Sequence, residues 1–531
     1  MNQASPAKLP LSLPLLALVF LALWLVAHYT REYLRLAHIP GPALARFSNL
    51  PRLWWVYRRE AHNVHIAQHR KYAAAPANAG SASAEPGWAP LVRYGPNAVS
   101  VGSAAAVDTI YRMRGDPLLK SDFYSVIPPM RKGAILPTIF ATQDEALHRV
   151  LKRPIASVYS MSNLVSFEPL VDRTIDVFRK ELDSRFVATG ETCDFGTWLQ
   201  YFAFDVVGEI TFSKRLGFLE GGRDVEGIMA GIWRWFEYVA VVGQMPWIDS
   251  IWVKNKLLSR MRPAKWSPMV QFANKREEER RAMSAADKDK NDRDFLSRFV
   301  AAMEKDPSIP PWALRAWTSS NIIAGSDTTA IYLRTMFHQL LTHPASMARL
   351  RAELDEATAE GRLSASTASW KQSTALPYLS ACFKEAGRVH PPFGLHLERV
   401  VPPGGLDVCG RRLPPGTVVG MNAWVVHRDP DMFGPDADAW RPERWLEGDE
   451  TRIKRMEASL LTFGAGHRIC LGKHISYLEI FKLVPTLLQG YDIELVDEGK
   501  TWTVENRWFV PQSGLNVRLR KREAKEYEIR R

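Results

Sequence analysis

The chain has 531 residues, 46% of them hydrophobic, and a formal net charge of +12, so it can bury a large core. No linker rich in glycine, serine or proline divides it, and its four cysteines form no CxxC pair, which argues against two large domains, a zinc site or a disulfide framework. Basic residues are interleaved with acidic ones and no nucleic-acid-binding motif accompanies them, so we expect no nucleic-acid partner.

The first predicted element is a membrane-spanning helix at about residues 9–29. This stretch is almost continuously apolar, with no charge between Lys8 and Arg31, and about 20 residues cross roughly 30 Å of hydrocarbon. A cleavable signal peptide is the alternative, but the stretch is long and lacks a clean small-x-small cleavage site. Arginines follow the stretch whereas only Lys8 precedes it, so the rest of the chain is expected in the cytosol. We therefore divide the chain into a membrane anchor with its linker, residues 1–38, and a globular domain, residues 39–531.

Beyond the anchor, the sequence predicts a mainly α fold with small β sheets. Residues 91–101 are expected to form two short strands around a Gly-Pro turn. Helical periodicity dominates from about residue 145 to 360, and strand and turn signals return at 400–419 and near 502–519. The basic run at 518–522 is expected to be a solvated tail or a contact with a membrane surface.

A long apolar helix is predicted at about residues 313–341, with Ala-Gly-Ser-Asp-Thr-Thr at 324–329 inside it. Glycine followed by Ser, Asp and two Thr is poor composition for a helix interior. Such a breach of local preference is expected where function overrides stability. On the residues alone, the alternative is a helix cap or a set of hydroxyls bonded to the preceding turn.

A further predicted helix carries Glu385 and Arg388, which share one face because they are three residues apart. Alone, such a pair is usually a surface ion pair of little energetic value. Here it precedes a helix stop, Val-His-Pro-Pro at 389–392, and lies upstream of Arg-Pro-Glu-Arg-Trp at 441–445.

The most informative segment is residues 463–472, Phe-Gly-Ala-Gly-His-Arg-Ile-Cys-Leu-Gly. Its three glycines let the backbone bend and approach a flat partner closely. Cys470 precedes a predicted helix, 473–488, whose N-terminal dipole and nearby cations favour a thiolate. A thiolate held in this way is a suitable axial ligand for haem iron. The alternative is a free cysteine beside a glycine turn.

Residues 463–472 resemble the haem-binding signature of the cytochrome P-450 superfamily, and the two helix motifs stand in that family's order and spacing. The resemblance extends from about residue 39 to 520. It implies the cytochrome P-450 fold with an N-terminal transmembrane anchor helix, and haem b bound through Cys470 as the axial ligand of the iron. The other residues that it implies for cofactor binding are His148, Lys152, Arg399, Phe463, Gly464, Arg468 and Gly472.

The resemblance also implies roles within the two helix motifs. Asp327 and Thr328 correspond to the acid–alcohol pair that relays protons during dioxygen activation, which is general acid work. Glu385, Arg388 and Arg444 correspond to a buried network that locks the haem-binding region and has a structural role.

Haem propionates require cations, and the resemblance selects Arg399, Arg468 and the helix that begins at His148. Many relatives carry a tryptophan or histidine four residues before an arginine in that helix. Here Lys152 occupies the fourth position after His148 and Arg153 follows it. Either of these two cations is a candidate for contact with a propionate, and an exposed basic helix is the alternative.

Dioxygen activation needs two electrons, and the chain has no nucleotide-binding motif. The resemblance therefore implies electrons from NADPH through a membrane-bound NADPH–cytochrome P-450 reductase, with cytochrome b5 as a further candidate partner. It also implies a single-pass protein of the endoplasmic reticulum membrane with its catalytic domain in the cytosol. The expected reductase-docking surface includes Lys152, Arg153, Arg468 and Lys473.

Residues 399–429 resemble fungal monooxygenases of the pisatin-demethylase type, many of which serve secondary metabolism. This resemblance implies oxidation of a lipophilic small molecule, with a pocket expected at 123–140, 319–324, 393–397 and 509–512. Two other functions share Cys470: a haem-thiolate isomerase or dehydratase that needs no reductase, and a non-catalytic haem-binding membrane adaptor. The Asp327–Thr328 pair argues against both.

Overall fold

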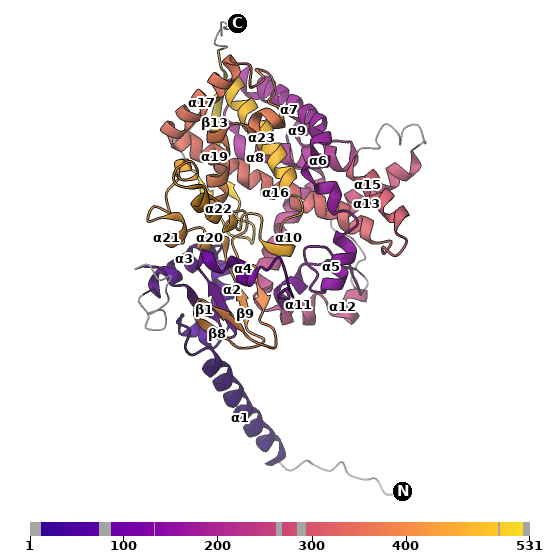
Figure 1. Ribbon diagram of the computed structural model, residues 1–531. Helices are drawn as coiled ribbons and strands as arrows, with labels where there is room; N and C mark the ends of the chain where they lie inside the picture. Colours follow the sequence, from indigo (N-terminus) through magenta and orange to yellow (C-terminus); the bar gives the residue numbers. More distant parts are fainter. Residues whose placement is uncertain are drawn as a thin grey trace.

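The computed structural model describes residues 12–73, 87–131, 133–261, 268–283, 294–497 and 500–523. Helices predominate, and the sheets are small (Figure 1). This arrangement confirms the predicted mainly α class. The predicted anchor falls within helix α1 (Ser12–Arg35), although residues 9–11 lie outside the described residues.

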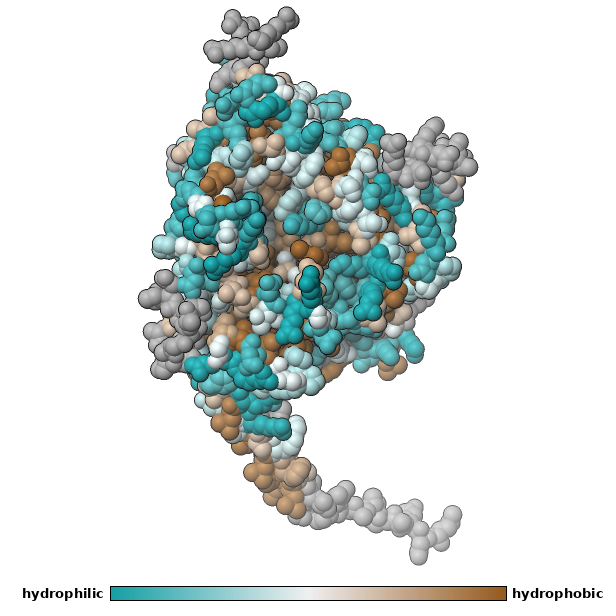
Figure 2. Space-filling view, viewed as in Figure 1, coloured by the Kyte–Doolittle hydropathy of each residue, from teal (hydrophilic) through white to brown (hydrophobic). Residues whose placement is uncertain are grey.

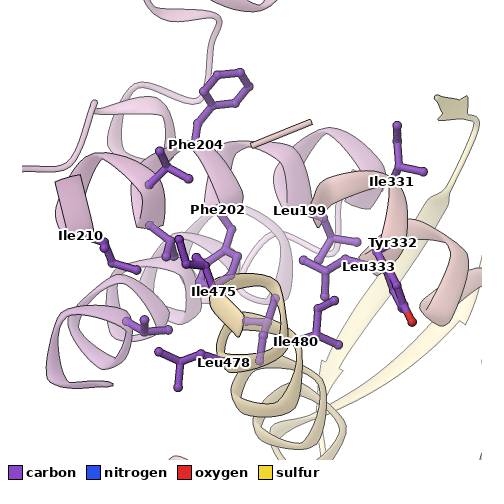
Figure 3. Packing of buried hydrophobic residues seen from close by; sticks show 14 of the residues in the cluster. Leu199, Phe202, Phe204, Ile210, Ile331, Tyr332, Leu333, Ile475, Leu478 and Ile480 are labelled. Atoms are coloured by element: carbon purple, nitrogen blue, oxygen red, sulfur yellow. The ribbon is translucent and has the colours of Figure 1, made fainter. Parts of the chain in front are cut away.

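The core forms around helix α16 (Ala313–Thr342), which packs against α8 (Phe195–Phe212) and α23 (Lys473–Gly490). Nearly every residue of α8 is buried, because the helix is apolar around its whole circumference. Figure 3 shows the packing between these helices, with Leu199 and Phe202 of α8 beside Leu333 of α16 and Ile475 of α23. The predicted ranges of the two latter helices are confirmed to within two residues.

The remaining α-helices surround this core. They are α2 (Leu50–Tyr57), α3 (Ala61–Lys71), α4 (Val107–Ile110), α5 (Glu145–Lys152), α6 (Met161–Leu164), α7 (Glu168–Leu182), α9 (Phe218–Gly221), α10 (Ile228–Val242), α11 (Pro246–Trp252), α12 (Lys256–Met261), α13 (Pro268–Ala282), α15 (Phe295–Lys305), α17 (Pro344–Ala359), α18 (Trp370–Thr374), α19 (Pro377–Val389), α20 (Ala423–Val426), α21 (Pro430–Phe433) and α22 (Glu450–Ala458). Short 3₁₀ turns join several of them, among them η3 (Asp122–Val126), η4 (Ala156–Tyr159), η8 (Pro442–Trp445) and η9 (Gly466–Arg468).

The largest sheet has four strands in the order β1-β2-β9-β6. Its strands are β1 (Leu91–Gly95), β2 (Ala98–Val101), β9 (Val418–Gly420) and β6 (Arg399–Val400). The predicted strands at 91–101 form its antiparallel hairpin. The other sheets pair β10 (Tyr491–Leu495), β13 (Asn516–Lys521) and β5 (Cys193–Asp194); β11 (Thr503–Val504) and β12 (Gln512–Ser513); β3 (Met130–Arg131) and β4 (Ala134–Ile135); and β7 (Leu406–Val408) and β8 (Arg411–Leu413).

The basic run at 518–522 is not a solvated tail, because most of it lies in strand β13. Its partner strand β10 places acidic residues opposite the arginines: Glu494 faces Arg518 and Asp492 faces Arg520. Opposite charges on facing residues of antiparallel strands attract each other. The acidic residues of β10 therefore stabilise the basic run as a strand.

Helix α1 extends away from the body, and Figure 2 shows its apolar surface. Phe20 is 73% exposed and Leu16 is 64% exposed. The segment Leu15–Arg35 is long and apolar enough to cross a membrane. This agrees with the predicted span in place and composition.

Candidate active site

A largely apolar cavity of about 370 Å³ lies inside the body. Helices α10 and α16, the segment before α5 and the loop that carries Cys470 all contribute to its wall. Cys470 and Ala324 are accessible, although the core surrounds them, because both open into this cavity. The cysteine loop and the small-residue segment of α16 therefore face the same space.

The glycines of the cysteine loop have specific geometric roles. Gly464 and Gly466 adopt φ values of +68° and +67°, in the left-handed region that favours glycine. A Cβ on Gly466 would lie 2.3 Å from the carbonyl oxygen of Tyr111, whereas a Cβ on Gly464 would make only ordinary van der Waals contacts, the nearest with Leu397 at 3.9 Å. The amide of Cys470 donates to the carbonyl of Phe463 at 2.8 Å and closes the loop. This loop presents the Cys470 side chain to the cavity.

The electrostatic surroundings of Cys470 differ in part from the expectation. Although Cys470 opens into the cavity, the protein around its sulfur keeps bulk water away and raises the pKa of the thiol, while the amides of Gly472 and Lys473 and the charges of Lys473 and Lys152 oppose this shift. The amides and cations act in the predicted direction, but burial outweighs them. The protein therefore does not by itself favour the thiolate, and a bound metal ion would have to supply that preference, since coordination deprotonates a thiol.

Helix α16 continues unbroken through the Gly-Ser-Asp-Thr-Thr segment. The hydroxyls of Ser326 and Thr328 donate to the carbonyls of Ile322 and Ala324, both at 2.7 Å. Both hydroxyls therefore bond to the preceding turn of the helix, which is the structural alternative that the sequence left open for this segment. Thr328 nevertheless lines the cavity, so the structural role leaves room for a chemical one.

Asp327 points away from the cavity, toward α8. Its carboxylate is fully buried and accepts a hydrogen bond from the side-chain amide of Gln200. Arg334 donates to the other end of the same amide at 2.6 Å. Burial raises the pKa of Asp327 to about 7, against the opposing effects of Arg334 and Gln200. Oδ2 of Asp327 has no hydrogen-bond partner within the described part of the chain. The predicted acid and alcohol therefore occupy different faces of α16.

The predicted cofactor-binding residues converge on the cavity. His148, Lys152, Arg399, Phe463, Gly464, Arg468, Cys470 and Gly472 all line it. Lys152 donates to the carbonyl of His467 at 2.6 Å, whereas the neighbouring Arg153 is exposed to solvent. Of these two cations, Lys152 is the one on the cavity wall.

Sequence reasoning missed Lys120, which also lines the cavity. Lys120, Lys152, Arg399 and Arg468 form what we call the cation cluster. Burial lowers the pKa of Lys120 well below its ordinary value, and the charges of Arg399 and Arg468 lower it further. A cluster whose members disfavour one another's charge is suited to an anionic ligand.

One carboxylate, that of Glu145, contacts the cation cluster from outside the cavity wall. It accepts from Arg468 at 2.7 Å. Burial and the charges of Arg468 and Lys152 lower the pKa of His148 to about 3, so this side chain is neutral. Within the described part of the chain, one acid stands against four basic side chains, so basic groups outnumber acidic ones at this edge of the cavity.

Aromatic rings close another part of the cavity. Among the predicted pocket segments, Phe140, Phe393 and Phe509 line the cavity, whereas Gln512 instead donates to the hydroxyl of Thr335 at 2.8 Å. Trp508 also lines it but was not predicted. The φ of Trp508 is +78°, a strained value for a bulky residue. Such strain is characteristic of ligand-binding positions. Helix α10 adds two more unpredicted rings, Trp235 and Phe236.

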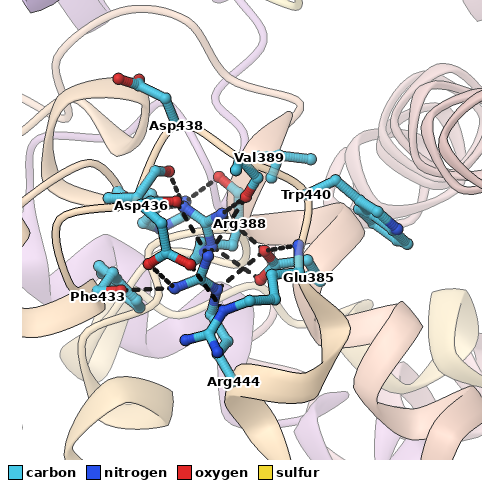
Figure 4. A network of polar contacts seen from close by, with 12 residues as sticks. Glu385, Arg388, Val389, Phe433, Asp436, Asp438, Trp440 and Arg444 are labelled. Carbon is cyan, nitrogen blue, oxygen red and sulfur yellow. Dashed lines mark hydrogen bonds and ion pairs between the residues drawn. The ribbon is translucent and has the colours of Figure 1, made fainter. Parts of the chain in front are cut away.

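The structure brings the predicted Glu385–Arg388–Arg444 network together (Figure 4). Glu385 accepts from Arg388 at 2.7 and 2.8 Å and from Arg444 at 3.0 Å. The indole of Trp445 donates to it at 2.9 Å. Although burial opposes the change, the two arginines lower the pKa of Glu385. All three charged side chains are fully buried.

A family model for cytochrome P450 matches residues 127–519. The chain belongs to the cytochrome P450 family. A cytochrome P450 monooxygenase of Aspergillus terreus is 55% identical over 468 residues, which cover 87% of this chain and 91% of that protein. The cytochrome P450 monooxygenase cicH of Emericella nidulans is 50% identical over 511 residues, 96% of this chain and 98% of the relative. The cytochrome P450 monooxygenase mpaDE' of Penicillium brevicompactum is 47% identical over 522 residues, 97% of this chain and 59% of the relative.

These similarities confirm the predicted family and reaction class. The chain is a cytochrome P450 monooxygenase, and membership of the family implies a haem iron cofactor. Monooxygenases of this family in general use redox partners and lipophilic substrates.

Proposed function

We propose that this P450 is a membrane-anchored monooxygenase that oxidises a lipophilic small molecule with electrons from an NADPH–cytochrome P450 reductase. The observation that carries the proposal is that Cys470 and Thr328, from two different elements, face one largely apolar cavity. We place the reaction in fungal secondary metabolism, because residues 399–429 resemble pisatin-demethylase-type enzymes and the relatives described above come from fungi.

The donor set of the cavity fits haem b. Cys470 would hold the iron through its sulfur, and the cation cluster would provide counter-charges for two propionates. Gly464 and Gly472 carry no side chain that would take up space there. Lys152, rather than the exposed Arg153, is the cation of α5 assigned to a propionate. Bound haem supplies the iron that activates dioxygen, while the chain binds the substrate, excludes water and delivers protons.

Thr328 and Asp327 have different parts in proton delivery. Thr328 presents its hydroxyl at the cavity and can donate a proton there, while Asp327, with its pKa near 7, holds a proton on the α8 side of the helix. A pKa close to the working pH suits a general acid. Losing a positioned acid costs about 10²–10⁴-fold in rate.

The proposed electron donor docks through exposed cations near the cysteine loop. Arg153 is exposed and Lys473 is half-buried at the start of α23. The side chain of Arg468 is only 4% exposed and pairs with Glu145, so we remove Arg468 from the expected docking surface. Lys152 likewise faces the cavity. The proposed docking surface for the reductase, or for cytochrome b5, therefore consists of Arg153 and Lys473.

Membrane attachment is proposed for α1 and for the neighbouring end of the body. Trp54 and Tyr57 of α2, and Trp247 and Trp252 of α11, are more than half exposed. Figure 1 places α2 and α11 at the same end as α1. Tryptophan and tyrosine favour membrane interfaces. We propose the endoplasmic reticulum as the membrane, with the catalytic domain, residues 39–531, in the cytosol.

The test of the assignment is Cys470→Ser. The variant should lose the thiolate-specific Soret shift of the reduced carbon-monoxide complex, and an unchanged spectrum would exclude Cys470 as the ligand. Consumption of NADPH and oxygen with an added reductase distinguishes a monooxygenase from an isomerase, a dehydratase or an adaptor, none of which consumes either one.

Thr328→Ala tests the proton-delivery assignment. The variant should keep haem and substrate binding but divert electrons into hydrogen peroxide, so that less product forms per NADPH consumed. Coupling equal to that of the parent, at matched haem content, would restrict Thr328 to its hydrogen bond with Ala324.

A further inference from the structure

Two short segments, 119–121 and 398–400, pair beside the cavity. Lys120 lies directly opposite Arg399 in an antiparallel bridge. The amide of Val400 donates to the carbonyl of Leu119 at 2.8 Å. In such a pairing, opposite residues share a face and their chain neighbours take the other face. Lys120 and Arg399 therefore face the cavity together, and the residues next to them face away from it.

On the outer face, Ser121 lies against Glu398. The serine hydroxyl donates to Oε2 of Glu398 at 2.6 Å. The phenol of Tyr94 on β1 donates to Oε1 at 2.9 Å, and Arg52 of α2 also pairs with Oε1. Glu398 is 5% exposed. Its carboxylate thus connects α2, β1 and the segment 119–121 in a buried position.

The side chains on the inner face, which is the side toward the cavity, destabilise the same pairing. Like charges directly opposite each other across antiparallel strands are destabilising, and Lys120 and Arg399 are such a pair. The ammonium of Lys120 lies 4.1 Å from the ring centre of Tyr124 and 4.2 Å from that of Phe140. Lys120 also donates to the carbonyl of Phe140. Against the repulsion between Lys120 and Arg399, the Ser121–Glu398 bond on the outer face and the Val400–Leu119 backbone bond keep the two segments in register.

We propose that Glu398 is a positioning residue for the cofactor: through Ser121 it holds Lys120 and Arg399 side by side, so that both cations face the haem propionates. The inference rests on the propionate role proposed above for the cation cluster. Glu398 itself lies outside the cavity wall and acts only through the paired segments. Loosening the pairing weakens retention of haem while the Cys470 loop stays intact.

The test is the rate at which the full-length holoenzyme loses haem to excess apomyoglobin, followed by the Soret band. Ser121→Ala removes the hydrogen bond to the charged Glu398, and also the acceptor of the Phe123 amide at 3.3 Å, and should speed haem loss roughly tenfold. Ser121→Thr keeps a hydroxyl and should restore the parent rate. The matched control is Ser346→Ala, at another buried serine, whose hydroxyl accepts from the indole of Trp440 at 3.1 Å; it should retain haem like the parent.

Two further variants locate the effect. Tyr94→Phe leaves the Ser121–Glu398 bond in place and should change haem loss less than Ser121→Ala does. Equal rates in these two variants, or a parent-like rate in Ser121→Ala, would overturn the positioning role. Arg399→Gln should also speed haem loss. If Arg399→Gln does so and Ser121→Ala does not, the propionate role stands and the positioning role fails; if Arg399→Gln retains haem like the parent, both fail.

Discussion

The Glu385 network and the cation cluster are both groups of charged side chains inside the body, but their charges are organised in opposite ways. Around Glu385, the two arginines pair with two carboxylates, those of Glu385 and Asp436, and their remaining donors reach carbonyl oxygens, such as those of His427 and Ala439. In the cation cluster, four basic side chains face one carboxylate of the described residues, that of Glu145. A network whose donors and acceptors are matched stabilises the fold, whereas an excess of one charge at a cavity marks where a ligand completes the network.

The largest effect is expected at Glu385. Glu385→Ala leaves Arg388 and Arg444 buried without their carboxylate, which costs about 3–5 kcal/mol. The variant should give little folded protein, or unfold at a much lower denaturant concentration, as followed by circular dichroism. A parent-like unfolding midpoint would show that the two arginines do not need this acid.

Asp327→Asn tests the second buried acid through pH. The pKa of Asp327 is raised to about 7 in the folded chain, so the folded state keeps a proton that the unfolded chain releases above about pH 4. The free energy of unfolding of the parent therefore falls, relative to that of the variant, as pH rises from about 4 to 7. Above pH 7 the difference in free energy between the two proteins stays constant. The total change is roughly 4 kcal/mol. Unfolding midpoints of both proteins across this range measure it, and a difference independent of pH would contradict the raised pKa.

Lys120→Met should have effects of opposite sign on two forms of the protein. Removing one basic group from a self-repelling cluster stabilises the haem-free chain by about 0.2–1 kcal/mol, while the same change weakens haem retention. Denaturant unfolding of the haem-free protein and haem transfer from the holoenzyme measure the two effects. Destabilisation of the haem-free chain, as expected for Glu385→Ala, would mean that the cation cluster is neutralised without a ligand.

The smallest effect is expected on the surface. Lys454 and Glu450 form an ion pair at 2.6 Å on α22, and their side chains are 69% and 81% exposed. Lys454→Ala should change stability by less than about 1 kcal/mol. A larger loss of stability would show that solvent screens this ion pair less than the exposure of its two side chains implies. Exposed and buried ion pairs would then differ less in energy than expected.

The motifs of the site were predictable because each one is local. The glycine-flanked Cys470, the Glu385–Arg388 pair and the Asp327–Thr328 segment have fixed spacings, and their backbone requirements appear in the sequence. The face on which Asp327 lies was not predictable, because Gln200 of another helix determines it.

The sequence did not predict contacts between segments that are far apart along the chain. Lys120 resembles any surface lysine until its pairing with Arg399 is known, and Trp508 gave no signal of its left-handed backbone. The same limitation explains the basic run at 518–522. Its charges suggested solvent, and only the partner strand β10 shows why the run is ordered. Long helices were predicted well because their periodicity is local.

The Ser121–Glu398 hydrogen bond joins residues 277 positions apart in the chain. At synthesis rates of about 5–20 residues per second, Ser121 is added to the chain roughly 15–55 s before its partner exists. Until then Lys120 remains hydrated and the site lacks Arg399 and Cys470. Haem can therefore be loaded only after nearly the whole chain has been made, and a ribosome stalled before residue 398 carries a nascent chain that cannot retain the cofactor.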